Sequence, residues 1–141
     1  MAEEIMVRFA APEDLDFLSR DSRVPAEDLR GKIERREVIM AERGTAAVGF
    51  LRLEYLWSFI PYVALIRVSP EFRRGGVGKA MLRFTEDYLR TRGHVALYSS
   101  SQADEPEPQA WHRHVGFEEC GYIAGINGGG VGEVFFRKLL G

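Results

Sequence analysis

The pattern of apolar and polar positions changes period several times along the chain, and each change predicts a new element. Residues 5–10 alternate as a half-buried strand does. A helix is predicted from Pro12, because proline suits the first turn of a helix. A second short helix is predicted from Pro25, with Leu29 and Ile33 four residues apart on one face. The chain therefore opens with a strand and two short helices.

A hairpin and a strongly apolar strand are predicted next. Residues 37–43 and 47–54 read as two strands joined by a tight turn at Gly44. Pro61 is interpreted as a break, and residues 62–68 as a strand of the buried type. The Ser-Pro pair that follows ends this strand, because the residue before a proline disfavours the helical conformation.

The clearest helix of the chain follows this strand. Its apolar side recurs at steps of three and four residues, through Val77, Met81, Phe84, Thr85, Tyr88 and Leu89. Gly93 then stands where a helix-ending glycine is expected.

The last third of the chain alternates between strands and one helix. We expect a strand at 94–99, a polar segment at 100–108, a short helix at 107–114 and two strands at 117–126 and 133–139 around a glycine-rich turn. A hairpin followed by alternating strands and helices predicts a mixed α/β or α+β sheet.

Composition narrows the class of protein. A length of 141 residues suits a single domain, predicted to span residues 1–141. Lys plus Arg number 19 and Asp plus Glu 21, so the net charge of -2 argues against a general nucleic-acid binder. Hydrophobic residues make up 45% and charged residues 28%, as in a compact soluble domain. The single cysteine, Cys120, excludes an internal disulfide and a cysteine-based zinc site.

Two further features bear on location. The longest uncharged apolar stretch, residues 55–66, is shorter than the about 20 residues that span a bilayer. The acidic start Met-Ala-Glu-Glu lacks the pattern of a signal peptide. We therefore expect a cytoplasmic protein that binds no membrane. We also expect a monomer or a homodimer that binds no nucleic acid and no metal.

The most informative segment joins the apolar strand to the long helix. Glycines at the start of a helix leave its first amide N–H groups bare, and these groups attract a phosphate. Arg73, Arg74 and Lys79 add full positive charge beside Gly76 and Gly78. The pattern predicts a cradle for a pyrophosphate group.

Motif spacing selects among phosphate ligands. A Walker A loop requires a glycine where Arg73 stands, and the dinucleotide pattern G-x-G-x-x-G fails at Met81. The pattern that fits is R-x-x-G-x-G, as Arg73-x-x-Gly76-x-Gly78. A second motif, Ala-Trp-His-Arg-His-Val-Gly-Phe at 110–117, follows after a helix and a strand.

With these two motifs, the chain resembles the GNAT superfamily of N-acetyltransferases over nearly its whole length. The resemblance implies a mixed, mostly antiparallel central sheet of about seven strands, flanked by about four helices and splayed around a cofactor cleft. It implies acetyl-CoA as co-substrate, bound to backbone groups of the apolar strand and to the glycine loop. The implied cofactor-binding residues are Ile66, Val68, Arg73, Arg74, Gly75, Gly76, Val77, Gly78 and Lys79.

The catalytic residues are less clear, because two expected side chains are absent. Many relatives place a carboxylate near the apolar strand, and here the nearest is Glu54, which is also open to interpretation as a solvated charge. Relatives usually carry a Tyr acid in the helix before Gly-Phe. Counting back, that position is His112, for which packing is the alternative interpretation. Candidates for the acceptor pocket are Trp57, Tyr62, Asp104 and Glu105.

The sequence therefore predicts an acetyl-CoA-dependent N-acetyltransferase that acts on a primary amine of a small molecule or a peptide. The amine is expected to attack directly in a ternary complex. The alternative is a non-catalytic acyl-CoA-binding or sensing module, which the missing Tyr and the missing carboxylate favour. Whether the glycine-rich segment Gly125–Gly132 forms a lid stays open.

Overall fold

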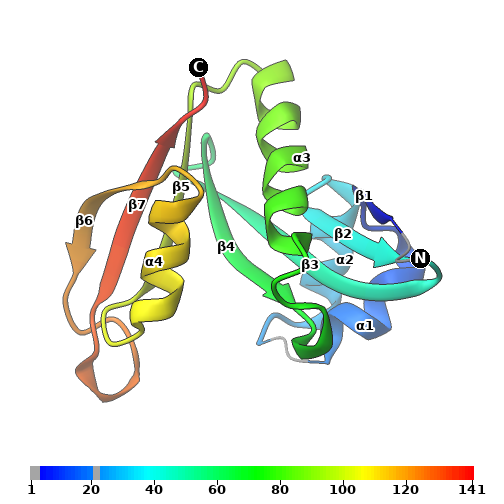
Figure 1. Cartoon of the computed structure of the whole chain (residues 1–141), viewed down its shortest axis with the longest axis horizontal. Coiled ribbons are helices and arrows are strands. Elements are labelled where there is room, and N and C mark those ends of the chain that lie inside the picture. Colours follow the sequence, from blue (N-terminus) through cyan, green and yellow to red (C-terminus); the bar gives the residue numbers. More distant parts are fainter. Residues whose placement is uncertain (1–3, 21–22) are drawn as a thin grey trace. The chain divides into compact units, whose positions relative to one another are not determined.

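The computed structural model describes residues 4–20 and 23–141 of the chain. The acidic start on which the expectation of no signal peptide rests lies, except for Glu4, outside the described residues. Figure 1 shows the arrangement of the elements. The strands are β1 (Ile5–Phe9), β2 (Val38–Arg43), β3 (Ala46–Leu56), β4 (Ile60–Val68), β5 (Ala96–Gln102), β6 (Glu118–Ile123) and β7 (Glu133–Leu139). The helices are α1 (Leu15–Ser19), α2 (Ala26–Glu34), α3 (Val77–Thr91) and α4 (Pro106–His114), with short 3-10 turns at Pro12–Asp14, Pro70–Phe72 and Gly128–Gly130.

The strands form one mixed sheet in the order β1-β2-β3-β4-β5-β7-β6. The pairs β1–β2, β2–β3, β5–β7 and β6–β7 are antiparallel, and β4–β5 is parallel. The predicted seven-stranded, mostly antiparallel sheet with four helices is confirmed for the described residues. Two compact units share its strands: unit 1 is Met1–Leu53 with Leu65–Asp87, and unit 2 is Glu54–Ala64 with Tyr88–Gly141.

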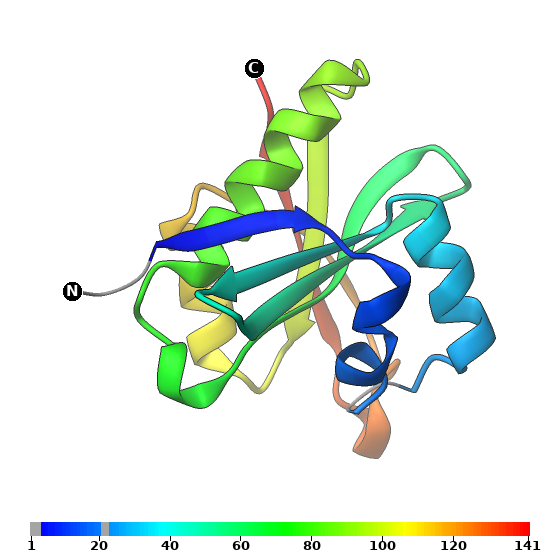
Figure 2. The ribbon, with the colours of Figure 1, turned by 90° about the vertical axis from the view of Figure 1, so that its right-hand side faces the viewer.

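In unit 1, helices α1 and α2 lie next to each other and cover one face of the first strands (Figure 2). Leu18 of α1 and Leu29 and Ile33 of α2 are buried against Val38 and Met40 of β2. Val38 and Met40 are two positions apart, so both side chains point to the same face of β2. Burial of these apolar side chains is the main force that holds the helices on the sheet.

Helix α3 packs on the sheet of unit 1 at a glycine. A Cβ added to Gly49 of β3 would lie 2.6 Å from the carbonyl oxygen of Arg67, 3.2 Å from Met81 and 3.3 Å from Val77. Further along the helix, the rings of Phe9 and Phe84 meet edge to face at 5.1 Å. The missing side chain of Gly49 therefore allows the first turn of α3 to lie close to β3.

In unit 2, helix α4 covers one face of β5 and β7, as Figure 1 shows. Leu97 and Phe136 are fully buried on this face, and Phe117 after the helix is almost so. The side chains that alternate with them point to the opposite face, where Tyr62 of β4 stacks on Phe135 with ring centroids 5.8 Å apart. The two faces of this part of the sheet thus differ, one apolar beneath α4 and the other aromatic and polar.

Strands β4 and β5 differ from their predicted bounds in ways that have a physical reason. Pro61 does not break the chain but is the buried second residue of β4, a position near a strand start where the missing N–H is tolerated. Strand β5 begins at Ala96 and runs to Gln102, so Ser100 belongs to the strand and not to the polar segment predicted at 100–108. Polar side chains on a half-covered strand conceal its pattern from a search for apolar periodicity.

None of the helices in the described part of the chain is long and apolar enough to cross a membrane.

Candidate active site

The glycine loop in unit 1 is tied to the strands that precede it. The backbone N–H of Ser69 donates to the carbonyl oxygen of Val48 on β3 at 2.8 Å. The guanidinium Nε of Arg73 donates to the carbonyl oxygen of Val68 at 3.1 Å. Arg73 is exposed, and this bond holds its guanidinium group near the end of β4. The first arginine of the motif therefore holds the loop in place as well as adding charge.

Left-handed backbone conformations turn the chain from the loop into helix α3. The φ angles are +68° at Arg74 and +83° at Gly76. The first intrahelical bond runs from the N–H of Ala80 to the carbonyl oxygen of Gly76 at 2.9 Å. Helix geometry leaves the N–H groups of Val77, Gly78 and Lys79, which precede Ala80, without a carbonyl partner in the helix. These donors carry partial positive charge and suit an anion.

The space above Gly76 is open. Apart from Gly76 itself and its two chain neighbours, no described residue has an atom within 4 Å of the point where its Cβ would be placed. A phosphate can thus approach the bare backbone at this glycine, which is the fit that the pyrophosphate of acetyl-CoA requires. The residues present fit this group.

A basic residue that the sequence did not indicate lies beside the same loop. A Cβ on Gly75 would lie 3.4 Å from a terminal guanidinium nitrogen of Arg43, at the end of β2. The Nε of Arg43 is buried, and no residue in the described parts of the chain accepts a hydrogen bond from it. Arg43 precedes the motif by 30 positions, and only the fold places it beside Gly75. No local signal could have found it.

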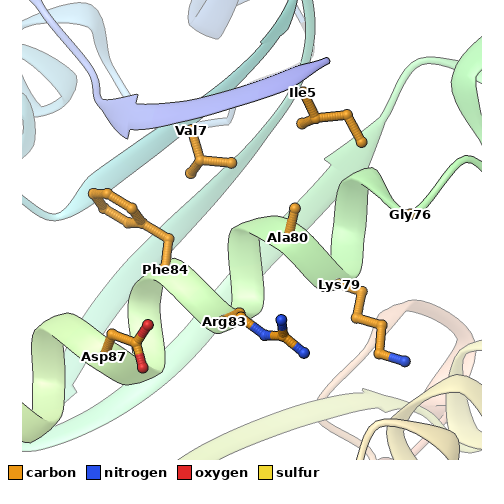
Figure 3. A pocket seen from close by; sticks show the side chains of 8 residues that line it. All are labelled: Ile5, Val7, Gly76, Lys79, Ala80, Arg83, Phe84 and Asp87. Carbon is orange, nitrogen blue, oxygen red and sulfur yellow. The ribbon is translucent and has the colours of Figure 1, made fainter. Parts of the chain in front are cut away.

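An open groove of about 510 Å³ begins at Gly76 and runs along the first turns of α3 (Figure 3). Side chains of Ile5, Val7, Ala80 and Phe84 face one another across it from β1 and α3. Lys79, Arg83 and Asp87 line its helix side. The predicted charge of Lys79 therefore lies at the start of α3, near the loop, and Arg83 adds a second cation one turn further on.

In unit 2, His112 is buried, with 4% of its surface exposed. Its Nδ1 lies 2.7 Å from the carbonyl oxygen of Pro108, and its Nε2 lies 2.7 Å from the hydroxyl of Ser99. A carbonyl can only accept, so Nδ1 carries the proton and Nε2 accepts from Ser99. The ring stacks on Phe136 with centroids 4.6 Å apart. Burial lowers the pKa of His112, so the imidazole is neutral near pH 7.

A chain of hydrogen bonds crosses the opposite face of the sheet in unit 2. The hydroxyls of Tyr62 and Ser100 are 2.6 Å apart, and Ser100 donates to Oε2 of Glu133 at 2.6 Å. Asn127 donates to the other carboxylate oxygen of Glu133 at 2.9 Å and to the carbonyl oxygen of Gly132 at 3.2 Å. Of these hydrogen-bonded residues, the sequence predicted only Tyr62 as a site residue. The residues are far apart in sequence, because they come from β4, β5 and β7 and from the loop before β7.

The other predicted pocket residues of unit 2 do not gather at one place. Glu54 of β3 is half-buried and acts electrostatically on Tyr62, where it helps to raise the pKa of the phenol. Trp57 lies in the turn before β4 and is 77% exposed. Asp104 and Glu105 are exposed after the end of β5. Because β4 and β5 run parallel, Trp57 and this acidic pair lie at opposite ends of the two strands.

The strand residues expected to bind the cofactor through their backbone lie in the last part of β4. Within unit 2, strands β4 and β5 pair at Tyr62 with Tyr98 and at Val63 with Ser99. Ile66 and Val68 follow these positions along β4. Among the described residues, no group of three His, Cys, Asp or Glu side chains is placed to hold a metal ion.

Comparison with known proteins agrees with the fold. The model of the acetyltransferase (GNAT) family matches residues 6–117. The ribosomal-protein-alanine N-acetyltransferase of Brucella melitensis is 24% identical, with a TM-score of 0.80, and the match covers 95% of this chain and 99% of that one. The structure of yncA from Salmonella typhimurium with its cofactor acetyl-CoA is 16% identical, with a TM-score of 0.82, and the match covers 97% and 94%.

A third similar structure, the ribosomal-protein-S18-alanine N-acetyltransferase of Escherichia coli, is 15% identical with a TM-score of 0.80 and matches over 97% of this chain and 94% of that one. No curated protein matches the chain in sequence. The family model covers most of the chain, and the chain therefore belongs to the GNAT family of acetyltransferases. Membership of this family supports acetyl-CoA as its co-substrate.

Proposed function

We propose that this chain is an N-acetyltransferase that moves the acetyl group of acetyl-CoA to a primary amine of a small molecule or a peptide. The observation that carries the proposal is the open backbone at Gly76, directly before helix amides that have no carbonyl partner in the helix. A glycine with a left-handed φ and empty space above it suits an anion held by main-chain donors. The reaction is proposed to proceed by direct attack in a ternary complex.

The grip on the cofactor is assigned to two stretches of unit 1. The amides of Gly75, Gly76, Val77, Gly78 and Lys79 would hold the pyrophosphate, with Arg73, Arg74 and Lys79 adding charge. The main chain of Ile66 and Val68 would pair with the pantetheine arm. When bound, acetyl-CoA supplies the acetyl group as a thioester, which backbone N–H groups can polarise.

His112 and Glu54 are the candidates for proton transfer that the sequence named. His112 is neutral, donates its Nδ1 proton to Pro108 and accepts from Ser99 at Nε2. It can protonate the leaving thiolate through Ser99 only after the ring proton moves from Nδ1 to Nε2 and the hydroxyl of Ser99 turns to donate outward. We expect His112→Phe to lower turnover by about a hundredfold or more if this path is used, at nearly unchanged affinity for acetyl-CoA. Glu54→Gln is expected to lower turnover only modestly. A loss of about a thousandfold in Glu54→Gln would instead identify Glu54 as the base.

The amine class of the acceptor draws support from the names of similar proteins. Two of the similar structures are N-acetyltransferases for an alanine of a ribosomal protein. A third, nourseothricin acetyltransferase, is 24% identical and matches 74% of this chain and 65% of that one, with a TM-score of 0.67. Both peptide amines and small molecules therefore belong in the acceptor panel.

Two measurements on the intact chain test the proposal. Calorimetry with acetyl-CoA measures binding, and release of free thiol in the presence of a panel of amines measures transfer. We expect binding, and thiol release that depends on at least one amine. Binding without turnover for any amine would support the alternative, a non-catalytic acyl-CoA-binding or sensing module. Absence of binding would contradict both.

A further inference from the structure

The hydrogen-bond chain of unit 2 has a direction. Ser100 donates its only hydroxyl proton to Glu133. The bond between Tyr62 and Ser100 must therefore be donated by Tyr62, because a hydroxyl carries one proton. Both protons point the same way, from Tyr62 toward Glu133. The lone pairs on the oxygen of Tyr62 remain free to accept a proton at the start of the chain.

We propose that Tyr62, Ser100 and Glu133 form a proton wire that removes the proton of the acceptor ammonium. The proton passes from the amine nitrogen to the oxygen of Tyr62, the proton of Tyr62 passes to Ser100, and that of Ser100 passes to Glu133. One N–H and two O–H bonds break and three O–H bonds form, without any change in oxidation state. This inference rests on the proposed function.

The wire prepares the amine for reaction. Its nitrogen lone pair, once free, attacks the thioester carbonyl, so that a C–N bond forms as the C–S bond breaks and the electron pair leaves with sulfur. A protonated amine cannot make this attack, and alkyl amines, with a pKa of about 10.4, are almost entirely protonated near neutral pH. Glu133 is half-buried, so it can pass the proton on to water.

The members of the wire are held in place from several elements. Asn127 donates to Oε1 of Glu133, which leaves Oε2 for Ser100. The ring of Tyr62 stacks on Phe135 at an interplanar angle of 27°. Each carboxylate oxygen has a second lone pair, so Glu133 can accept a proton without loss of these contacts. The geometry of the wire is therefore present before any substrate binds.

The charges around the wire favour a cationic acceptor. Burial raises the pKa of Tyr62, and the negative charges of Glu133 and Glu54 raise it further, so the phenol keeps its proton as a relay must. Glu133 also acts electrostatically on His112, from the other face of the sheet. Two carboxylates near one hydroxyl produce a negative potential that attracts an ammonium group.

Three single variants of the full chain test the wire. Tyr62→Phe keeps the stacked ring, Ser100→Ala removes the central hydroxyl, and Glu133→Gln removes the terminal acceptor. With an alkyl amine and saturating acetyl-CoA near pH 7, we expect each variant to lower kcat by about a hundredfold or more. The loss should shrink at higher pH, where free amine accumulates. Ser100→Thr retains a hydroxyl and should retain activity.

The double variant Tyr62→Phe/Glu133→Gln distinguishes a wire from two independent groups. Parts of one wire fail together, so the double variant should be no slower than the slower single variant. Losses that multiply, or a kcat of Tyr62→Phe equal to that of the parent, would overturn the proposal. Tyr98→Phe and Ser101→Ala, next to the wire but outside it, are the matched controls and should behave like the parent.

The measurements distinguish a failure of the proposed wire from a failure of the proposed function. If the parent transfers acetyl groups and the three variants match it, the wire is wrong and the function stands. If the parent binds acetyl-CoA but acetylates no amine, the function is wrong and the wire is overturned with it. Thermal unfolding and acetyl-CoA affinity are measured for each variant, and Ser100→Thr shows whether a loss reflects the hydroxyl or the fold.

Discussion

The Nε2 of His112 on helix α4 accepts a hydrogen bond from the hydroxyl of Ser99 on β5 at 2.7 Å, and both side chains are buried between the helix and the sheet. A buried polar atom that loses its partner retains the full cost of its removal from water, about 1–3 kcal/mol. His112 and Ser99 therefore depend on each other for stability, whatever their role in catalysis.

A double-mutant cycle tests this dependence. We expect His112→Phe and Ser99→Ala each to lower the free energy of unfolding by about 1–3 kcal/mol, because each leaves the other group unpaired. The double variant should lose less than the sum of the two. Denaturant unfolding measures all three, with the exposed His114→Phe as control. Strictly additive losses would show that the bond contributes nothing to stability.

Stability should also depend on pH through His112. Burial lowers its pKa in the folded chain below the ordinary value of 6.5, so below that value the unfolded chain binds the proton more readily. The unfolding free energy then falls as the pH drops below about 6.5, by at most about 1.4 kcal/mol per pH unit. The stability difference between the parent and His112→Phe should narrow from pH 7 to pH 5. A constant difference would contradict the lowered pKa.

A comparison of variants at two glycines with the same φ angle distinguishes an effect on cofactor binding from backbone strain. Gly76 and Gly93 both have a φ of +83° and open space around the missing Cβ. Alanine at either position should cost about 1 kcal/mol of stability. Only Gly76→Ala should weaken acetyl-CoA binding, by about tenfold or more, because its methyl group fills the space above the helix amides. Equal affinities by calorimetry would remove Gly76 from the phosphate site.

Arg74 combines a positive charge with an unfavourable conformation, since its φ is +68°. We expect Arg74→Gly to raise the free energy of unfolding by up to about 1 kcal/mol, because glycine adopts this region freely, and Arg74→Ala to leave it unchanged. Both should weaken acetyl-CoA binding similarly and less at high salt, since an exposed charge is screened. A weaker effect in one of them would show that backbone shape at residue 74 also matters.

Gly49 should be intolerant of a side chain. A Cβ there would lie 2.6 Å from a backbone oxygen, which cannot move aside as a side chain can. We expect Gly49→Ala to lower the unfolding free energy by about 1–3 kcal/mol and to weaken acetyl-CoA binding, because the start of α3 is displaced. Gly121→Ala on β6, where a Cβ meets no atom within 4 Å, is the control and should be neutral. Equal melting temperatures for the two variants would contradict this packing.

Much of the fold was predictable because its signals are local. The helix period from Val77, the prolines at helix starts and the glycines at turns each act within a few residues, and the structure confirms the elements that they predict. The mispredicted end of β5 and the supposed break at Pro61 have one cause. Whether a polar residue or a proline fits within a strand depends on what covers that strand.

The sequence by itself determined the order of the elements, the R-x-x-G-x-G loop and the family, because these depend on spacing along the chain. Only the tertiary structure decided that Arg43 lies beside Gly75 and that Ser100 joins Tyr62 to Glu133. These partners are 32, 38 and 33 positions apart. Strand register and side-chain direction bring them within reach, and neither is encoded by a residue and its immediate neighbours.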